Sequence, residues 1–168
     1  SQYKNTHTID DFGSLDTNKK NDCKVYNSDE NQIKESESHN ISSSSPRSVI
    51  VIDDEIELLV IFRTFLIRKG YSVMSFSEPL LALEHIKKNR DRHCLLIADI
   101  KMSGMSGIEL AKKVRDDNTN IKIFLMTAFD IRDFENNFDI KAFRIDRLIQ
   151  KPFRFSDMLD IIKITFEK

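Results

Sequence analysis

Long hydrophobic runs are absent from this sequence of 168 residues. The longest apolar runs contain five residues each, at Leu58–Phe62 and Cys94–Ala98. A transmembrane helix needs roughly 20 apolar residues, so we expect no membrane span. The N-terminal residues also lack the apolar core of a signal peptide.

Cysteine is scarce, because the chain contains two such residues, Cys23 and Cys94. Two widely separated cysteines are too few for the disulfide framework of a small secreted domain, and they match no zinc-binding spacing. We therefore expect a reduced, cytoplasmic environment.

The chain also lacks an excess of charge of one sign. It has 26 Lys and Arg residues against 27 Asp and Glu residues, for a formal net charge of −1. This balance argues against nucleic-acid binding through an overall basic field. We accordingly expect no direct binding of DNA.

The first 48 residues contain few apolar side chains. Nine are apolar, beside ten serines and six asparagines. Such a segment buries too little surface to offset the conformational entropy lost on folding. We predict that residues 1–46 form a disordered polar tail and residues 47–168 one folded domain. A tail that folds on a partner or carries modification sites remains an open alternative.

The folded part alternates between strand and helix patterns. Val49–Ile52 is a β-branched run without polar alternation, which is typical of a strand covered on both faces. The predicted strands are 49–52, 71–76, 94–98, 121–126 and 148–150, and the predicted helices begin near 56, 78, 106, 130 and 156. This alternation predicts an α/β fold with a doubly wound, five-stranded parallel sheet flanked by five helices.

Local signals place the faces and ends of the helices. Ile56 and Val60 belong to the apolar series of the first helix, which we expect to end at Gly70. Ser106 and Ser156 are predicted N-caps of the third and last helices. The helix predicted over 130–144 has the weakest apolar pattern.

Polar side chains stand where four of the predicted strands end. They are Asp53 and Asp54, Asp99, Thr127 and Lys151, in chain order. Sites in open parallel sheets form beyond the carboxyl ends of the strands, so we expect these side chains to lie close together. A divalent cation such as Mg²⁺ relieves the repulsion among three carboxylates. A carboxylate can also attack a phosphoryl group, and a lysine and a hydroxyl can bind the new charge.

Each of these residues taken alone also has a structural explanation. Asp53 and Asp54 can stabilise a helix N-terminus, and Asp99 can be a turn residue. Thr127 and Lys151 are common as structural and solvated side chains. Their occurrence together at four strand ends favours a site.

Four stretches that close predicted strands carry a distinctive combination of residues. They are Val51-Ile52-Asp53-Asp54-Glu55, Ile97-Ala98-Asp99-Ile100-Lys101-Met102-Ser103-Gly104-Met105-Ser106-Gly107, Met126-Thr127-Ala128 and Gln150-Lys151-Pro152-Phe153. Together they resemble the receiver domain of two-component response regulators, over residues 47–168. The resemblance implies a flavodoxin-like (βα)5 fold and a stand-alone phosphorelay receiver, a signalling switch rather than an enzyme.

The resemblance also implies an acceptor and a metal site. Asp99 would accept the phosphoryl group from a sensor histidine kinase or a phosphotransfer protein. Asp53, Asp54, Asp99 and the backbone carbonyl of Lys101 would bind Mg²⁺, with Mn²⁺ as an alternative.

It further implies groups that bind the transferred phosphoryl group. These are the hydroxyl of Thr127, the backbone of Ala128 and the ammonium of Lys151. The Lys151–Pro152 peptide would be cis, a form nearly confined to bonds that precede proline. Phosphorylation would switch the binding of an unknown downstream protein or promote a homodimer.

Three departures from the family pattern bear on mechanism. Ser103 stands where the family commonly has proline, which should loosen the loop. Leu148 occupies the switch position, where the family usually has an aromatic residue. Lys101 and Phe129 flank the expected path of the hydrolytic water, so we expect a long-lived phosphoryl group on Asp99.

Two other functions remain open. One is a pseudo-receiver, an interaction module that never carries phosphate. The other is a small phosphohydrolase of the haloacid-dehalogenase type, which would need a second aspartate where Lys101 stands. His85 and His93 are predicted to be surface residues away from the strand ends.

Overall fold

The computed structural model describes residues 47–117, 120–133 and 143–167. The tail predicted over 1–46 lies outside these residues, as does most of the helix predicted over 130–144. At the end of that predicted helix, Phe143 and Arg144 form a turn, and Arg144 has a φ of 52°.

The described residues contain all five predicted strands. The elements are β1 (Ser48–Ile52), α1 (Ile56–Arg68), β2 (Ser72–Phe76), α2 (Pro79–Lys88), β3 (Leu95–Asp99), α3 (Gly107–Asp117), β4 (Lys122–Thr127), β5 (Arg147–Gln150) and α5 (Phe155–Phe166). Within these described ranges, no helix combines the length and the hydropathy needed to cross a bilayer.

The strands form one parallel sheet in the order β2-β1-β3-β4-β5. The chain leaves β1 toward β2 on one side and later returns to β3 on the other side. This reversal places the topological switch point between β1 and β3, where α/β sheets bind ligands beyond the strand ends. The doubly wound sheet predicted from the sequence is therefore confirmed.

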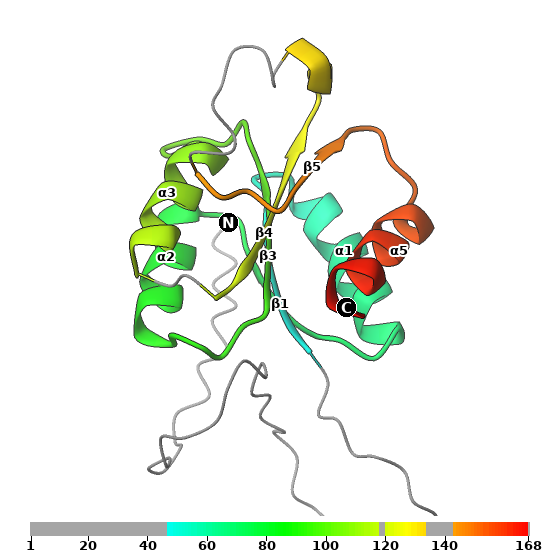
Figure 1. Ribbon diagram of the computed structural model, residues 1–168, viewed down its shortest axis with the longest axis horizontal. Helices are drawn as coiled ribbons and strands as arrows, with labels where there is room; N and C mark the ends of the chain where they lie inside the picture. The colour runs from blue at the N-terminus through cyan, green and yellow to red at the C-terminus, as the bar shows by residue number, and fades with distance from the viewer. Residues whose placement is uncertain (1–46, 118–119, 134–142, 168) are drawn as a thin grey trace, which may run out of the picture.

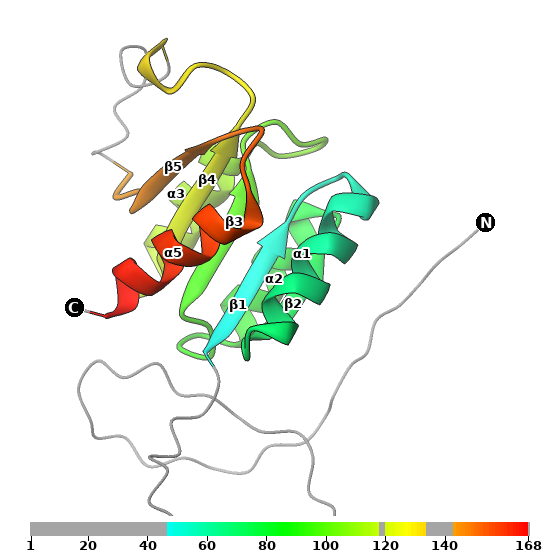
Figure 2. The same cartoon turned by 90° about the vertical axis from the view of Figure 1, so that its right-hand side faces the viewer.

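Helices cover both faces of the sheet, as Figures 1 and 2 show. Ile50 and Ile52 of β1 pack with α2 and α3 on one face. Val49 and Val51 pack with α1 and α5 on the other face. All four side chains are fully buried, which explains the β-branched run without polar alternation.

Two predicted helix ends agree with the structure. Gly70 follows α1 with a φ of 88°, the left-handed conformation in which glycine ends helices. Before α3, the Ser106 hydroxyl accepts a hydrogen bond from the Glu109 N–H at 3.2 Å. The Glu109 carboxylate accepts one from the Ser106 N–H at 3.0 Å, which completes a capping box.

The predicted cap of the last helix is wrong, because α5 begins at Phe155 with Arg154 as its N-cap residue. The Phe155 ring packs edge-on against Phe62 of α1, with centroids 4.9 Å apart. Packing of this partly buried ring on α1 brings the helix start forward, and Ser156 lies exposed within the first turn.

The apolar series of α1 is only partly buried. Leu59, Phe62 and Leu66 face the sheet, but Ile56 and Val60 are 56% and 59% exposed. The helix therefore presents apolar side chains on its outer face as well as its inner one.

Candidate functional site

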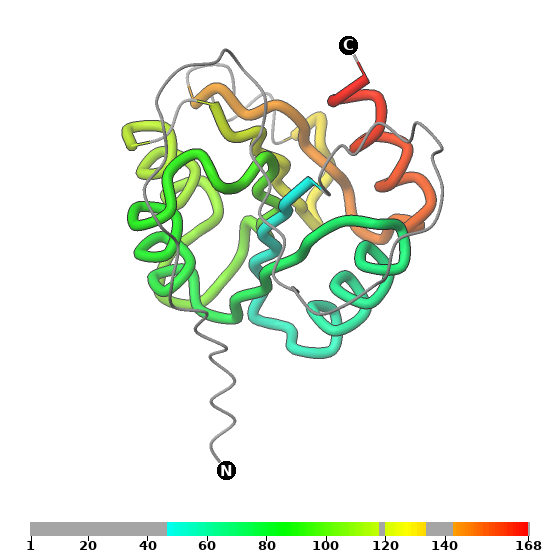
Figure 3. The backbone as a smooth tube through the Cα atoms, turned by 90° about the horizontal axis from the view of Figure 1, so that it is seen from below, coloured from blue at the N-terminus to red at the C-terminus, as the bar shows by residue number. Residues whose placement is uncertain are grey.

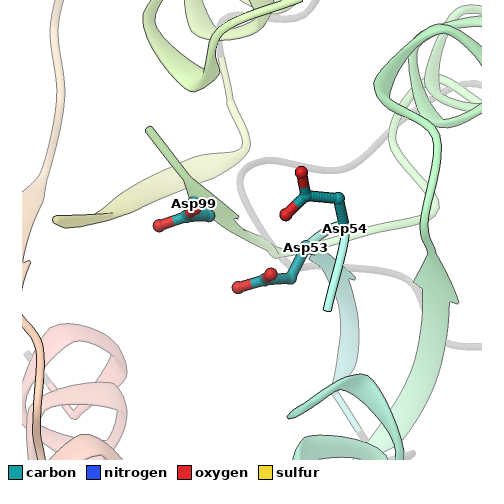
Figure 4. Close-up of side chains that lie close together, drawn as sticks. All are labelled: Asp53, Asp54 and Asp99. Carbon is teal, nitrogen blue, oxygen red and sulfur yellow. The ribbon is translucent and has the colours of Figure 1, made fainter. Parts of the chain in front are cut away.

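Three carboxylates meet where β1 and β3 end (Figure 4). Asp53 and Asp54 follow β1, and Asp99 is the last residue of β3. One oxygen from each carboxylate lies within 4.8 Å of the others. Asp53 is fully buried and Asp99 nearly so, while Asp54 is exposed. The cluster is thus buried at Asp53 and Asp99 and open to solvent at Asp54.

Lys151 joins two of these carboxylates. Its Nζ lies 3.1 Å from Oδ2 of Asp53 and 3.1 Å from Oδ1 of Asp99. The Oδ1 atom of Asp53 accepts a hydrogen bond from the Glu55 N–H at 2.9 Å. Both oxygens of the buried Asp53 carboxylate therefore have partners, as buried charge requires.

The pKa values of Asp99 and Lys151 are both raised, for different reasons. Burial raises the pKa of Asp99, the Lys151 ammonium partly offsets this rise, and the Asp53 and Asp54 charges add to it. Burial lowers the pKa of Lys151, but hydrogen bonds and attraction from Asp53 and Asp99 outweigh burial and raise it overall. Lys151 therefore stays charged between two acids.

The backbone holds Lys151 beside the end of β4. Thr127 pairs with Gln150 in the sheet, and the Lys151 N–H donates to the Thr127 carbonyl at 2.7 Å. The Lys151–Pro152 peptide is cis. This arrangement brings the side chains that end β4 and β5 to the carboxylates that end β1 and β3.

Thr127 is almost fully buried. Its Oγ1 accepts a hydrogen bond from the Phe129 N–H at 3.0 Å. Ala128 is exposed, and the Phe129 side chain is 59% exposed. The hydroxyl is therefore held by the loop, and the following two side chains face solvent.

The loop after β3 contains an element for which sequence reasoning gave no role, Gly107. Its N–H donates to the Ile100 carbonyl at 2.9 Å. A Cβ at this position would overlap the carbonyl oxygen of Asp99. A glycine just after a predicted N-cap is the only sequence signal for this close approach. Lys101 and Ser103 in the same loop are exposed.

Leu148 lies within β5, where it pairs with Leu125 of β4. Its side chain is partly buried and packs on the core shared with α2 and α3. Leu148 thus acts as a packing residue of the sheet in this structure.

The donor set fits a hard divalent cation. Asp53, Asp54 and Asp99 offer carboxylate oxygens, the ligands that Mg²⁺ prefers. Three carboxylates against the single Lys151 ammonium leave the cluster with excess negative charge. The exposed side at Asp54 leaves room for the waters that Mg²⁺ retains.

Comparison with known proteins gives a consistent result. The family model of the response regulator receiver domain matches residues 49–163. Sporulation initiation phosphotransferase F of Bacillus subtilis is 26% identical over 115 residues, which cover 68% of this chain and 90% of that protein. Polar-differentiation response regulator DivK of Brucella anthropi is 27% identical over 120 residues, which cover 70% of this chain and 94% of that protein.

Some relatives are much longer. This chain spans 19% of the putative two-component response regulator ARR21 of Arabidopsis thaliana, at 30% identity. It spans 24% of the transcriptional regulatory protein ZraR of Klebsiella oxytoca, at 32% identity. In these proteins the similarity is confined to one part of the chain.

Solved structures share the fold over the same region. Response regulator TrrA of Thermotoga maritima, in complex with Mg²⁺ and BeF, has a TM-score of 0.60 and 26% identity, covering 70% of this chain and 97% of that one. A CheY-like receiver domain protein of Methanospirillum hungatei has a TM-score of 0.67 and 25% identity, covering 73% and 95%. The chain belongs to the family of response regulator receiver domains.

Proposed function

We propose that this receiver takes a phosphoryl group onto Asp99 in a two-component phosphorelay. The observation that carries the proposal is the contact of Lys151 with both Asp53 and Asp99 at 3.1 Å. This contact holds the carboxylate of Asp99 beside an ammonium group that can bind the negative charge of the incoming phosphoryl group.

The donor is a phosphohistidine on a sensor histidine kinase or a phosphotransfer protein. An Oδ atom of Asp99 attacks phosphorus, an O–P bond forms, and the N–P bond of the phosphohistidine breaks. The departing imidazole keeps the electron pair and takes a proton from solvent. The product is an acyl phosphate on Asp99.

Asp53, Asp54, Asp99 and the backbone carbonyl of Lys101 would hold Mg²⁺, or Mn²⁺ in its place. Bound there, the cation neutralises charge on the phosphoryl oxygens. The partly open position of Asp54 supports this assignment, because a buried ligand set leaves no place for an incoming phosphoryl group.

Three groups at the ends of β4 and β5 would bind the phosphoryl oxygens. The Lys151 ammonium turns toward them from its present carboxylate partners. The Thr127 hydroxyl exchanges its contact with the Phe129 N–H for a phosphoryl oxygen, and the Ala128 N–H donates a further hydrogen bond. This exchange biases a two-state equilibrium of the β4–β5 region.

We infer a signalling role rather than turnover of a substrate. The similarity to sporulation initiation phosphotransferase F and to DivK supports a cytoplasmic partner in phosphoryl transfer. The output would be binding of a downstream protein or a phosphorylation-dependent homodimer, without direct contact to DNA.

Phosphorylation by a small donor tests this function without knowledge of the kinase. The protein is incubated with acetyl phosphate and Mg²⁺, and its intact mass is recorded. We expect the wild type to gain one phosphoryl group and Asp99→Asn to gain none. Asp160→Asn, which changes an exposed acid on α5, should behave as the wild type. Phosphorylation of Asp99→Asn to the same extent as the wild type would overturn the proposal. So would a wild type that gains no phosphoryl group from acetyl phosphate and none from a phosphohistidine protein.

A further inference from the structure

A chain of hydrogen-bonded side chains lies at the end of the sheet opposite the acidic site. This is the end at which β1 begins, the lower end in Figure 1 and the near end in Figure 3. Nε2 of His85 lies 2.9 Å from Nε2 of His93. Nδ1 of His93 lies 2.7 Å from Oγ of Ser48. His93 is 8% exposed, so its predicted surface location is wrong.

The remaining partners fix the direction of these hydrogen bonds. Arg92 donates from Nη1 to Oδ1 of Asn89 at 2.9 Å, and a guanidinium can only donate. The Nδ2 atom of Asn89 therefore donates, to the His85 carbonyl at 2.8 Å and to Nδ1 of His85 at 3.3 Å. Because Nδ1 of His85 accepts, its ring proton lies on Nε2.

The same logic assigns His93. Its Nε2 accepts the proton of His85, so its own proton lies on Nδ1 and is donated to Oγ of Ser48. Both rings are neutral in this arrangement. A metal ion would need the lone pairs of both Nε2 atoms, but one of these atoms carries the shared proton.

Among the described residues, the hydrogen-bond partners of the two rings offer no acceptor for an added proton. On Nε2 of His93 it would place two N–H groups against each other across 2.9 Å. On Nδ1 of His85 it would face the amide N–H of Asn89. Either charge would also be brought close to the Arg92 guanidinium, which acts on both rings.

Burial adds to this resistance to protonation. Burial first, and then repulsion by a protonated His85 and by Arg92, lower the pKa of His93 to about 3. Burial and Arg92 also lower the pKa of His85. The groups that act on the two rings are Arg92 and His85, and no carboxylate in the described part of the chain contributes to either shift.

We propose that His85 and His93 form a pH-sensitive latch, which fastens the C-terminal end of α2 and the start of β3 to β1 and opens when either ring binds a proton. Ser48 begins β1, and His93 precedes β3. The other ends of these two strands carry Asp53 and Asp99. The latch therefore holds the pair of strands on which the acidic site is built.

The direction in which pH changes the stability of the fold follows from the lowered pKa values of His85 and His93. A histidine in the unfolded chain has a pKa of about 6.5. Below this pH the unfolded chain therefore binds protons at histidines that stay unprotonated in the folded state. The contribution of the neutral His85–His93 pair to folding stability is complete above this unfolded-state pKa, and it is lost as the pH falls below that value. For His93 alone, the folding equilibrium constant should fall about tenfold between pH 7.5 and 5.5.

Histidine NMR of the wild type tests the tautomers without any variant. In ¹H–¹⁵N spectra of the imidazoles at pH 7.5, we expect His85 protonated on Nε2 and His93 protonated on Nδ1. At pH 5.5 His93 should still be neutral. Titration of both rings near pH 6.5 as independent groups, or the opposite tautomers, would overturn the proposal.

Unfolding in urea at pH 7.5 and 5.5 tests the effect on stability. His93→Asn keeps a donor near Ser48 but cannot take up the proton, so it should lose the tenfold pH effect that the wild type shows. His39→Asn leaves both latch histidines in place, so it serves as the control and should keep that effect. The same pH dependence in His93→Asn and wild type would contradict the latch. If His93→Asn fails to fold, His85→Asn replaces it in the comparison.

Discussion

Gly107, the first residue of α3, lies directly against the carbonyl oxygen of Asp99, the last residue of β3. The space that a Cβ would need is filled by that oxygen and by the Ile100 backbone. The N–H of Gly107 also closes the loop by donating to the Ile100 carbonyl. The backbone of the proposed acceptor residue is thus held by the helix that follows it.

Replacing Gly107 by alanine should therefore displace Asp99. Gly107→Ala forces the β3–α3 loop away from the sheet, and overpacking of this kind destabilises a protein by about 1–3 kcal/mol. Urea unfolding measures the loss, and phosphorylation with acetyl phosphate should be slowed. Gly104→Asn is the comparison variant, because Gly104 has a φ of 82° with no atom near its Cβ position. Its cost therefore comes from the backbone conformation, which asparagine adopts more readily than most residues, and not from an overlap with Asp99. Equal stability of Gly107→Ala and wild type would show that the close approach is unimportant.

Loss of the Lys151 ammonium should destabilise the folded state at neutral pH. Lys151→Met leaves the fully buried Asp53 without its cation, and breaking a buried pair costs about 3–5 kcal/mol. Partial exposure of Lys151 and solvent screening reduce this to about 2 kcal/mol. Lys163→Met changes an exposed lysine on α5 and should have little effect. A Lys151→Met protein as stable as this control in the absence of Mg²⁺ would contradict the predicted role.

Asp99→Asn should be more stable than the wild type at neutral pH without Mg²⁺. Because the folded-state pKa of Asp99 is raised, mainly by burial, the folded protein binds this proton more tightly than the unfolded chain. Stability from this group is therefore present at low pH and is lost as the pH rises through the folded-state pKa. Asp99→Asn should gain stability at pH 7, and this gain should vanish below about pH 4, near the unfolded-state pKa of aspartate. Urea unfolding in EDTA across this pH range measures the difference in stability between Asp99→Asn and the wild type. A difference that does not change with pH would refute the raised pKa of Asp99 as its cause.

Added Mg²⁺ should stabilise the wild type against heat. A ligand at ten times its dissociation constant contributes about 1.4 kcal/mol. Asp54→Ala should lose most of this response, because Asp54 is the carboxylate that is most open to solvent. Glu57→Gln, an exposed acid in the first turn of α1, should retain it. A response of equal size in Asp54→Ala would place the cation elsewhere.

The lifetime of the phosphoryl group should depend on Phe129. Its side chain is 59% exposed, and its N–H is bound to Thr127. Phe129→Glu replaces an apolar group with one that can orient water, so we expect dephosphorylation to become about tenfold faster or more. Phe129→Leu keeps an apolar group and should remain slow. Decay of the phosphorylated protein, followed by intact mass, gives both rates, and equal rates for the two variants would disprove the effect.

Much of the fold could be predicted from the sequence, because β1, β3 and β4 are buried and largely apolar runs, and because alternation of strands with helices predicts a parallel sheet. The residues at the strand ends could also be chosen, since parallel topology brings Asp53, Asp99 and Lys151 together. The features that depend on side-chain packing, such as the first residue of α5, could not be predicted. Packing of the Phe155 ring on Phe62 moved the start of α5, and Ile56 and Val60 are exposed because α1 has more apolar positions than its inner face can cover.

The latch was missed for a similar reason. His85 and His93 lie eight residues apart, and only the turn after α2 brings their rings together. A polar residue before a strand does not indicate by itself whether it faces solvent or a buried partner. Gly107 was likewise visible as a glycine, but its contact with Asp99 depends on how α3 approaches the sheet.

Chemical mapping of the phosphorylated residue tests the assignment of Asp99 as the phosphoryl acceptor. The protein is phosphorylated with acetyl phosphate and Mg²⁺ and then reduced with borohydride, which converts an aspartyl phosphate to homoserine. Peptide sequencing by mass spectrometry then identifies the reduced residue. We predict homoserine at position 99 and unchanged aspartate at positions 53 and 54. Homoserine at either of those two positions, with Asp99 intact, would show that Asp99 is not the acceptor.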